Sequence, residues 1–264
     1  MNTALLISLI PLGFFCVFLL LQLLYPKRTQ PHWVRQTRVI NNLALFVVNA
    51  LLTRLVVPVS LVTVALFAAE NGTGLLNWLS LPSIVELVLA VAVLDLSIYG
   101  QHVATHKIPL LWRFHKVHHA DREMDITTAV RFHPIELLLS TAYKALVIVL
   151  VGASPTAVAL FVLLLFIGPA FNHSNFAVPL AVDRWLRLVI ATPDVHRVHH
   201  STIRAEQDMN YGFFLICWDR WFGTYQAQPK GGHEQMLIGL PRNQEAEQAR
   251  LDQMLIAPFQ SPKA

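Results

Sequence analysis

The chain has 264 residues, of which 55% are hydrophobic. Only 14% are charged, against about 25% in typical soluble domains, and the mean hydropathy is +0.50, so an ordinary soluble domain is excluded. The net charge of +4 does not indicate nucleic-acid binding, because the basic residues cluster beside apolar spans, where membrane orientation explains them. We predict an all-α fold, a polytopic membrane helical bundle in which residues 1–264 form one integral-membrane domain with a histidine-rich helical cap on the cytoplasmic face.

Residues 1–80 are expected to anchor the chain in the membrane. Ala4–Tyr25 is uncharged and long enough to cross roughly 30 Å of hydrocarbon. A cleaved signal peptide would need a basic start and a shorter apolar core. Because Lys27 and Arg28 follow the segment and should stay in the cytoplasm, we expect an uncleaved span whose N-terminus lies outside.

A second span is predicted within Leu43–Ala69, where Arg54 and Pro58 interrupt the apolar pattern. Either Arg54 snorkels or faces other helices, or Leu43–Leu52 lies at the interface and the span begins later. The polar, turn-forming segment Glu70–Gly74 is then expected outside.

A third span, about Leu81–Tyr99, returns the chain to the cytoplasmic side and opens the expected catalytic core, residues 81–226. At its inner end, four side chains spaced four, three and four residues apart share one helix face: Asp95, Tyr99, His102 and His106. Pro109 predicts that this helix ends by about Lys107.

Asp95 is a charge near the inner end of a span, where charges are costly and mark function or pairing. We expect its carboxylate to accept a hydrogen bond from a metal-binding histidine. The alternative is a salt bridge to Arg54 or Arg113.

Leu110–Arg122 is predicted to be a short amphipathic helix, with histidines on one side and an interface-seeking apolar surface on the other. The following apolar stretch, Leu137–Phe171, is interrupted at Gly152–Pro155, which predicts a helical hairpin. The hairpin either crosses the membrane out and back or dips into it without crossing. Both versions return the chain to the cytoplasmic side, so that the second histidine set faces the first.

Thr192 and Pro193 predict the start of another helix, as its N-cap and first helical residue. The second histidine triplet follows on the first two turns. The aromatic-rich segment Met209–Tyr225 also carries charges, so it lies at the interface or packs on the site. Residues 227–264 are expected to form a polar C-terminal tail, with a weak helical pattern around Gln244–Ile256.

Three histidine motifs carry the expected chemistry. One H-x-x-x-H and two H-x-x-H-H motifs comprise, in chain order, His102 and His106, then His115, His118 and His119, then His196, His199 and His200. Imidazole is a good ligand for first-row transition metals, and pairs three or four residues apart share a helix face. One zinc site uses three or four protein ligands, so eight histidines favour two metals that share the cluster. Two metals can activate a small molecule or polarise a substrate oxygen, and their place at the membrane face favours a lipid substrate.

The motifs, in this order around apolar spans, resemble the fatty acid hydroxylase superfamily, the sterol desaturase-like integral-membrane oxygenases. The resemblance covers about residues 80–226 and extends to flanking segments, which are Leu111–Trp112, Arg131–Pro134, Thr192–Asp194, Asn210–Gly212, Trp218–Arg220 and Phe222–Tyr225. The chain departs from the family's pattern at Gly100, Gln101 and Val103. Because these positions flank ligands, the departure concerns the fit of the substrate more than metal binding.

The resemblance implies a non-haem di-iron site with two Fe. Such a site uses O2 and two electrons to hydroxylate or desaturate a C–H bond of a lipid, such as a sterol or a fatty acyl chain. The implied iron ligands are the eight motif histidines, with His133 and His173 as further candidates. We expect four other residues to support these ligands, namely Asp95, Tyr99, Asp194 and Asn175.

A separate electron donor is expected, a ferredoxin or a haem carrier with its reductase, because the sequence shows no fused carrier domain. The active site is expected on the cytoplasmic face, of the inner membrane if the chain is bacterial. Two other functions stay open: a two-metal membrane lipid hydrolase, and a haem- or metal-binding membrane protein without oxygenase activity. The sequence decides neither the lipid nor hydroxylation against desaturation.

Overall fold

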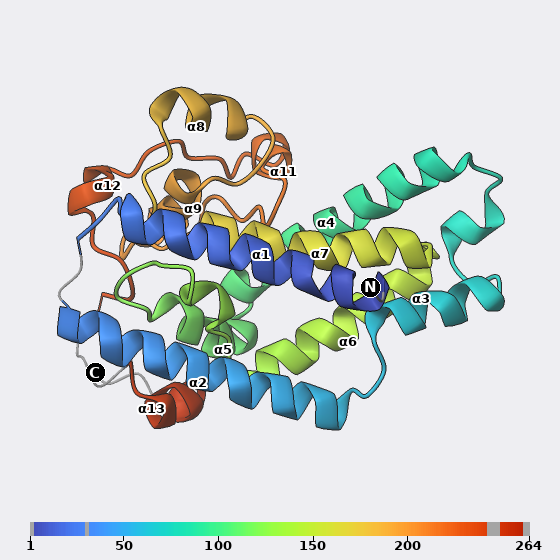
Figure 1. The fold of residues 1–264 in the computed structure, drawn as a ribbon, viewed down its shortest axis with the longest axis horizontal. Coiled ribbons are helices and arrows are strands. Elements are labelled where there is room, and N and C mark those ends of the chain that lie inside the picture. The colour runs from blue at the N-terminus through green and yellow to red at the C-terminus, as the bar shows by residue number, and fades with distance from the viewer. Residues whose placement is uncertain (1–2, 30–31, 242–248, 261–264) are drawn as a thin grey trace.

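The computed structural model describes residues 3–29, 32–241 and 249–260. Every regular element in these ranges is a helix, and strand pairing is limited to isolated bridges. The longer helices run along the molecule (Figure 1) and are α1 (Thr3–Leu24), α2 (His32–Val56), α4 (Ser83–Lys107), α6 (Pro134–Val151) and α7 (Pro155–Asn172). The predicted all-α fold is confirmed.

Short elements complete the chain. Two of them, α3 (Leu61–Glu70) and η1 (Leu75–Trp78), connect α2 to α4. The others gather toward the opposite end of the bundle, and they are α5 (Pro109–His119), η2 (Thr128–Val130), α8 (Leu180–Leu186), α9 (Pro193–His199), α10 (Arg204–Gln207), α11 (Cys217–Trp221), α12 (Gly232–Gln235), α13 (Leu251–Ile256) and η4 (Ala257–Phe259). This second set forms the cap that holds most of the histidines.

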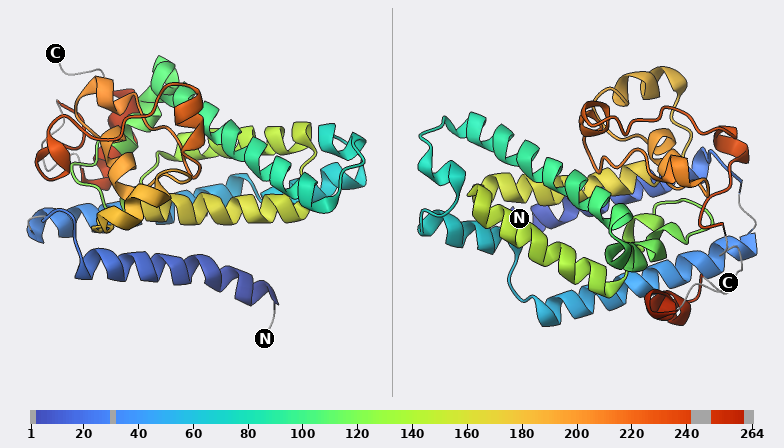
Figure 2. Two further views of the ribbon diagram at one scale, coloured as in Figure 1. Left: turned by 90° about the horizontal axis from the view of Figure 1, so that it is seen from above. Right: turned by 180° about the vertical axis from the view of Figure 1, so that it is seen from behind.

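The predicted membrane bundle is also confirmed. Four segments of the described chain are long and apolar enough to cross a membrane, namely Gln36–Trp78, Ser83–Lys107, Pro134–Val151 and Pro155–Asn172. Leu9–Leu24 adds a shorter apolar helix. Figure 2 shows α1 as an outer layer, and it lies along α7, where the rings of Phe18 and Phe171 are 5.4 Å apart.

The interruption predicted at Pro58 separates α2 from α3. α2 ends at Val56, and α3 starts after Ser60, whose hydroxyl accepts the backbone N–H of Thr63. A proline cannot donate to a helix and clashes with the preceding turn, so the helix breaks there. Arg54 lies in the last turn of α2, and the structure shows no ion pair between it and Asp95.

The predicted hairpin is formed by α6 and α7. Gly152 ends α6 with a φ of 69°, a left-handed conformation that favours glycine, and Ser154 caps α7. A Cβ added to Gly74 would lie 2.4 Å from the Cα of Gly152, so the two backbones pack directly on each other. This contact closes the end of the bundle opposite α5 and α9 (Figure 1).

The bundle core uses small residues where helices meet. Ala65, Ala90 and Ala157 are fully buried, together with Leu94 and Phe161. Small side chains let helix backbones approach closely, which is how helices associate in a membrane. The core thereby fixes α4 against α7, and these two helices lead into the histidine-rich end.

The segment Asp121–Thr128 is polar in sequence but mostly buried. Arg38 of α2 pairs with Asp121 and with Asp125, and the amide of Asn42 donates to Asp121 Oδ2 at 3.1 Å. Buried charges are tolerated when they are paired and hydrogen-bonded. The network therefore fixes this segment, and the end of α5 before it, against α2.

The predicted C-terminal tail contributes to packing. Met254 of α13 is buried against Leu45 of α2 and Val117 of α5. Residues 242–248, which include the beginning of the predicted helical pattern, lie outside the described residues. The described part of the tail thus packs against both α5 and α2.

Candidate metal centre

Two prolines set the positions of the histidine triplets. Pro109 follows the end of α4 and is the first residue of α5, and Pro193 is the first residue of α9. Proline suits this position because the N–H it lacks would be unpaired there. Thr192 holds the predicted N-cap position, although its hydroxyl makes no capping hydrogen bond with the described residues.

Nine buried histidines form two groups, each with candidate ligand atoms within 4.8 Å of one another. The first group consists of His102, His106, His115, His119 and His199. The second group consists of His118, His173, His196 and His200. All eight motif histidines are therefore brought together, and His173, at the end of α7, joins them.

Each H-x-x-H-H triplet divides between the two groups. In α5, His115 and His119 belong to the first group and His118 to the second. In α9 the division is reversed, because His199 belongs to the first group. Successive helical residues are about 100° apart, so residues i+3 and i+4 lie on the same face as residue i, about 60° to one side of it and about 40° to the other. One triplet can thus serve two ions.

The ring orientations in the first group are set by hydrogen bonds. Nδ1 of His102 bonds the carbonyl of Tyr211 at 2.7 Å, Nδ1 of His199 bonds the carbonyl of Met209 at 2.8 Å, and Nδ1 of His115 bonds Glu136 Oε1 at 2.6 Å. These bonds place the N–H on Nδ1 and leave the Nε2 lone pair free. Nε2 of all three rings is buried without a partner among the described residues. Such an orphaned set of acceptors fits a metal ion.

The second group has matching geometry. His173 donates from Nδ1 to the carbonyl of Pro169 at 2.9 Å, so its Nε2 carries the lone pair. This Nε2 lies 3.1 Å from Nε2 of His118 and 3.1 Å from Nε2 of His196. Two imidazoles bound at right angles to one ion, at about 2.1 Å each, have nitrogens about 3.0 Å apart. The residues present therefore fit a metal ion here as well.

The histidines are held in the form that binds metal. Burial lowers the pKa of His199 to about 3 and the pKa of His173 to about 4. For His119 and His200, burial first and neighbouring histidines second lower the pKa well below its ordinary value. These rings are neutral at physiological pH, and neutral imidazole is the metal-binding form. An all-imidazole set suits iron, zinc, copper or nickel rather than magnesium or calcium.

His133, which we also expected to be a ligand, lies in neither group. It is the N-cap of α6, where Nδ1 accepts the N–H of Ile135 at 3.2 Å, and its Nε2 lies 3.2 Å from the carbonyl of Leu255. Both ring nitrogens are engaged and the ring is turned toward the C-terminal segment, so the structure places His133 outside both groups.

Asp95 and Tyr99 bond to the aromatic-rich segment and not directly to a histidine. Asp95 Oδ2 accepts the indole N–H of Trp218 at 2.7 Å, so neither predicted arginine is its partner. Tyr99 bonds the hydroxyl of Thr224 at 2.9 Å. Both contacts hold the segment whose Tyr211 carbonyl orients His102.

Asp194 and Asn175 were also expected to support the ligands, but in the structure they contact the segment that follows α1. Asp194 pairs with Arg197 at 2.5 Å and lies 3.5 Å from Lys27. The amide of Asn175 donates to the backbone carbonyl of Arg28 at 2.8 Å. Their contacts connect α9 and the end of α7 to the segment after α1.

Two carboxylates that contact ligands were not predicted. Glu136 bonds His115, as above, and Asp208 Oδ1 lies 3.5 Å from His106 Nδ1. The available signal for Glu136 was a charge in the first turn of an apolar helix, a position where ionisable residues mark function. Asp208 carried no comparable signal, because it lies in a polar connection.

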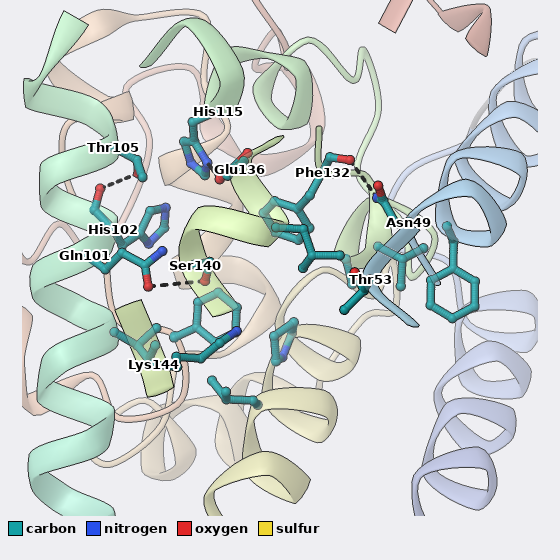
Figure 3. Close-up of a pocket in the computed structure, with 18 of the residues that line it drawn as sticks. Asn49, Thr53, Gln101, His102, Thr105, His115, Phe132, Glu136, Ser140 and Lys144 are labelled. Carbon is teal, nitrogen blue, oxygen red and sulfur yellow. Dashed lines mark hydrogen bonds and ion pairs between the residues drawn. The ribbon is translucent and has the colours of Figure 1, made fainter. Parts of the chain in front are cut away.

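A cavity of about 510 Å³ opens beside the first group (Figure 3). His102 and His115 line it at one end, with Phe132 and Glu136. Most of the remaining lining is apolar, from α2, α4, α6 and α7. A cavity of this size is within the range of small-molecule sites, about 300–1,000 Å³, so an apolar ligand can approach the first group from within the bundle.

Comparison with known proteins agrees with this site. The family model described as fatty acid hydroxylase matches residues 87–224, more than half of the chain. The ornithine lipid hydroxylase OlsE of Rhizobium tropici is 33% identical over 151 residues, which are 56% of this chain and 44% of that protein. The alkylglycerol monooxygenase of Homo sapiens is 30% identical over 146 residues, which are 55% of this chain and 31% of that protein.

A third relative, the cholesterol 25-hydroxylase of Rattus norvegicus, is 25% identical over 150 residues, which are 54% of this chain and 48% of that protein. The chain thus spans less than half the length of these curated relatives. No solved structure matches it. The matched region contains both histidine groups, including His173.

Proposed function

The chain belongs to the fatty acid hydroxylase family, and on this premise we propose that it is a membrane-bound oxygenase acting on a lipid. One O2, two electrons and two protons convert a C–H bond to C–OH and release one water. Hydroxylation is favoured over desaturation because the relatives are named hydroxylases and monooxygenases. Desaturation would use the same O2 and electrons but release two waters.

The observation that carries this proposal is the junction of two histidine groups with an apolar cavity inside a membrane bundle. His102 and His115 belong to the first group and also line the cavity. A lipid carbon in the cavity is thereby placed beside candidate metal ligands without passing through water. The site draws on no carboxylate ligand in the described residues, unlike an ordinary hydrolytic two-metal centre.

We propose that two iron ions occupy the site. His102, His106, His115, His119 and His199 hold one ion, and His118, His173, His196 and His200 hold the other. Iron supplies the redox chemistry that reduces O2. Elemental analysis of protein expressed with ample iron should find two iron atoms per chain, and one metal or none contradicts the di-iron assignment. If the analysis finds only zinc, the metal-free protein must be reconstituted with Fe(II) and measured again, because zinc binds such ligand sets more tightly than iron does.

The chain's own residues orient the ligands and exclude water. Glu136 and the carbonyls of Tyr211 and Met209 hold three rings by their Nδ1–H groups. Phe132 stacks on His118, with ring centroids 4.6 Å apart and planes inclined by 6°. This apolar face covers the imidazole on the cavity side and keeps the substrate end of the site dry.

Electrons come from a separate carrier, a ferredoxin or a haem carrier with its reductase, that approaches the cap. We place the cap on the cytoplasmic face because Lys27 and Arg28 lie at the same end as the histidines, where Arg28 donates to the His233 carbonyl at 2.7 Å. In a bacterium this would be the inner membrane.

Cysteine labelling tests this orientation. In a background with Cys16 and Cys217 replaced, Asn71→Cys should react with an impermeant maleimide on intact cells, and Ala205→Cys only after permeabilisation. Both positions are exposed. Labelling of Ala205→Cys from outside would reverse the assigned faces.

Turnover tests the activity itself. Lipid extracts from cells with and without the protein are compared by mass spectrometry under isotopically heavy O2, with the His199→Ala variant as the inactive control. A product heavier by one labelled oxygen supports hydroxylation, and loss of two hydrogens supports desaturation. A product formed without O2 or reductant would instead identify a hydrolase, and a Soret band in the purified protein would indicate a haem protein.

A further inference from the structure

Two cationic side chains, Arg54 and Lys144, line the cavity, although both lie in segments apolar enough to span a membrane. Within the part of the chain that the structure describes, neither one makes a hydrogen bond or an ion pair. Arg54 is exposed in the last turn of α2, and Lys144 is half-buried in α6. Charges within membrane spans are costly, and they usually mark a binding or transport site. The Glu136 carboxylate attracts Lys144 electrostatically but is itself bonded to His115. Because the metal centre uses neither Lys144 nor Arg54, both can take a further partner.

Lys144 lies at the end of the cavity away from the histidines. Glu136, Ser140 and Lys144 follow one another at four-residue spacing along α6 and all face the cavity (Figure 3). Eight residues of helix correspond to about 12 Å. Because Glu136 contacts His115 at 2.6 Å, Lys144 is about 12 Å along the helix axis from the metal end.

Polar side chains continue between these two ends. Ser140 donates to Gln101 Oε1 at 3.3 Å across the cavity, and Thr53 lines the α2 side. Gln101 is one of the positions where the chain departs from the pattern of the family. The departure therefore falls on the cavity wall, where it affects the fit of the substrate.

We propose that Lys144, assisted by Arg54, binds an anionic group of the substrate, a carboxylate or a phosphate. The alkyl chain then extends toward His102 and His115, so that the oxidised carbon lies about 12 Å from the anion. This inference rests on the proposed function and adds a substrate class, a long-chain amphiphile with an acidic group.

Electrostatics favours this orientation over the reverse. An anion beside Lys144 supplies a compensating charge for a cation that is half-buried in a membrane span. The same anion at the other end would face the carboxylate of Glu136, whose Oε2 is buried without a partner among the described residues. The ammonium of Lys144 also cannot easily extend to water at the far end of α6, because seven residues, about 10 Å, separate Lys144 from Val151, where the helix ends.

Competition binding tests the inference on the purified protein in nanodiscs, without O2 or reductant. The probe is a pyrene-labelled long-chain alcohol, and the competitors are hexadecanoate, hexadecyl phosphate and 1-hexadecanol, which share one chain length. One of the two anions should displace the probe at a concentration roughly tenfold or more below that of the alcohol. Whichever anion does so identifies the acidic group as carboxylate or phosphate.

Variants separate the charge from the fold. Lys144→Met should abolish the preference for the anion and leave the affinity for 1-hexadecanol unchanged, whereas Lys144→Arg should keep the preference. Lys230→Met, an exposed lysine outside the cavity, is the matched control. If Lys144→Met does not fold, Arg54→Gln should weaken the same preference by a smaller factor.

Equal competition by alcohol and anions in the wild type overturns the inference, as does an equal loss of all three affinities in Lys144→Met. The proposed oxygenase function is tested separately, because binding needs no turnover. Turnover without anion preference overturns the inference alone, and anion preference without turnover overturns the oxygenase proposal alone.

Discussion

The two histidine groups are built from the same motifs but differ in their surroundings. The first group reaches the cavity through His102 and His115, whereas no histidine of the second group is among the described residues that line it. Phe132 lies between the cavity and His118. We infer that the substrate meets the first ion, and that the second ion is reached only through the first group or from the cap.

The groups also differ in what orients their rings. Carboxylates and carbonyls contact Nδ1 of several first-group histidines, including His115 and His106. In the second group only His173 has such a partner, and Nδ1 of His118, His196 and His200 has none among the described residues. The first group is therefore placed by hydrogen bonds and the second mainly by packing, so the two should respond differently to substitution.

Removal of a ligand should have the largest effect and should separate the groups. His199→Ala should remove about half of the bound metal, from the first group, and His118→Ala a similar amount, from the second. Both should reduce turnover by more than about 100-fold, since loss of a supporting partner alone costs 10–100-fold. Elemental analysis and product formation measure these outcomes. If each variant loses both ions together, the groups behave as one site and the comparison fails.

Loss of Glu136 should affect the first group alone. Glu136→Leu removes the acceptor that orients His115 and should weaken metal affinity or turnover by roughly 10–100-fold. Glu136→Gln should restore part of the loss, because its amide oxygen can still accept the Nδ1–H. Metal titration of each variant is the measurement, with Ser140→Ala, one turn along the same helix, as the control. An unchanged affinity in Glu136→Leu would mean that packing orients both groups.

Asp95→Ala should act on stability more than on chemistry. It leaves the indole N–H of Trp218 buried without its acceptor, which should lower the free energy of unfolding by about 1–3 kcal/mol. Turnover should fall less than in Glu136→Leu, because Asp95 reaches His102 only through the segment that carries Tyr211. Thermal melting and steady-state turnover test this. A loss of metal as complete as in His199→Ala would place Asp95 among the ligands.

His133→Ala should have the smallest effect. Loss of the N-cap of α6 should lower stability by about 1 kcal/mol, and both ions should remain bound. Metal content and melting temperature are measured on the same preparation. Loss of either ion would restore His133 as a ligand and add a tenth histidine to the centre.

Local patterns in the sequence were enough to predict the long helices and most of the candidate ligands. Hydropathy, together with the glycines and prolines that end helices, predicts the bundle, the hairpin at Gly152 and the end of α4 before Pro109. Each of these features depends on residues close together in the chain. The spacing of His102 and His106, and of each triplet, likewise depends on one helix. Metal binding by these eight histidines could therefore be predicted without knowing how the helices pack.

Tertiary structure alone decided how the histidines divide and what supports them. His118 meets His173 across 55 positions of the chain, and His102 meets the Tyr211 carbonyl across 109, and no local periodicity encodes such pairs. The same reason explains why Asp95 bonds Trp218 instead of a histidine, and why His133 caps a helix. A motif determines which atoms are available on a helix face, whereas the crossing of α4, α5, α7 and α9 determines which of those atoms lie close enough to share an ion.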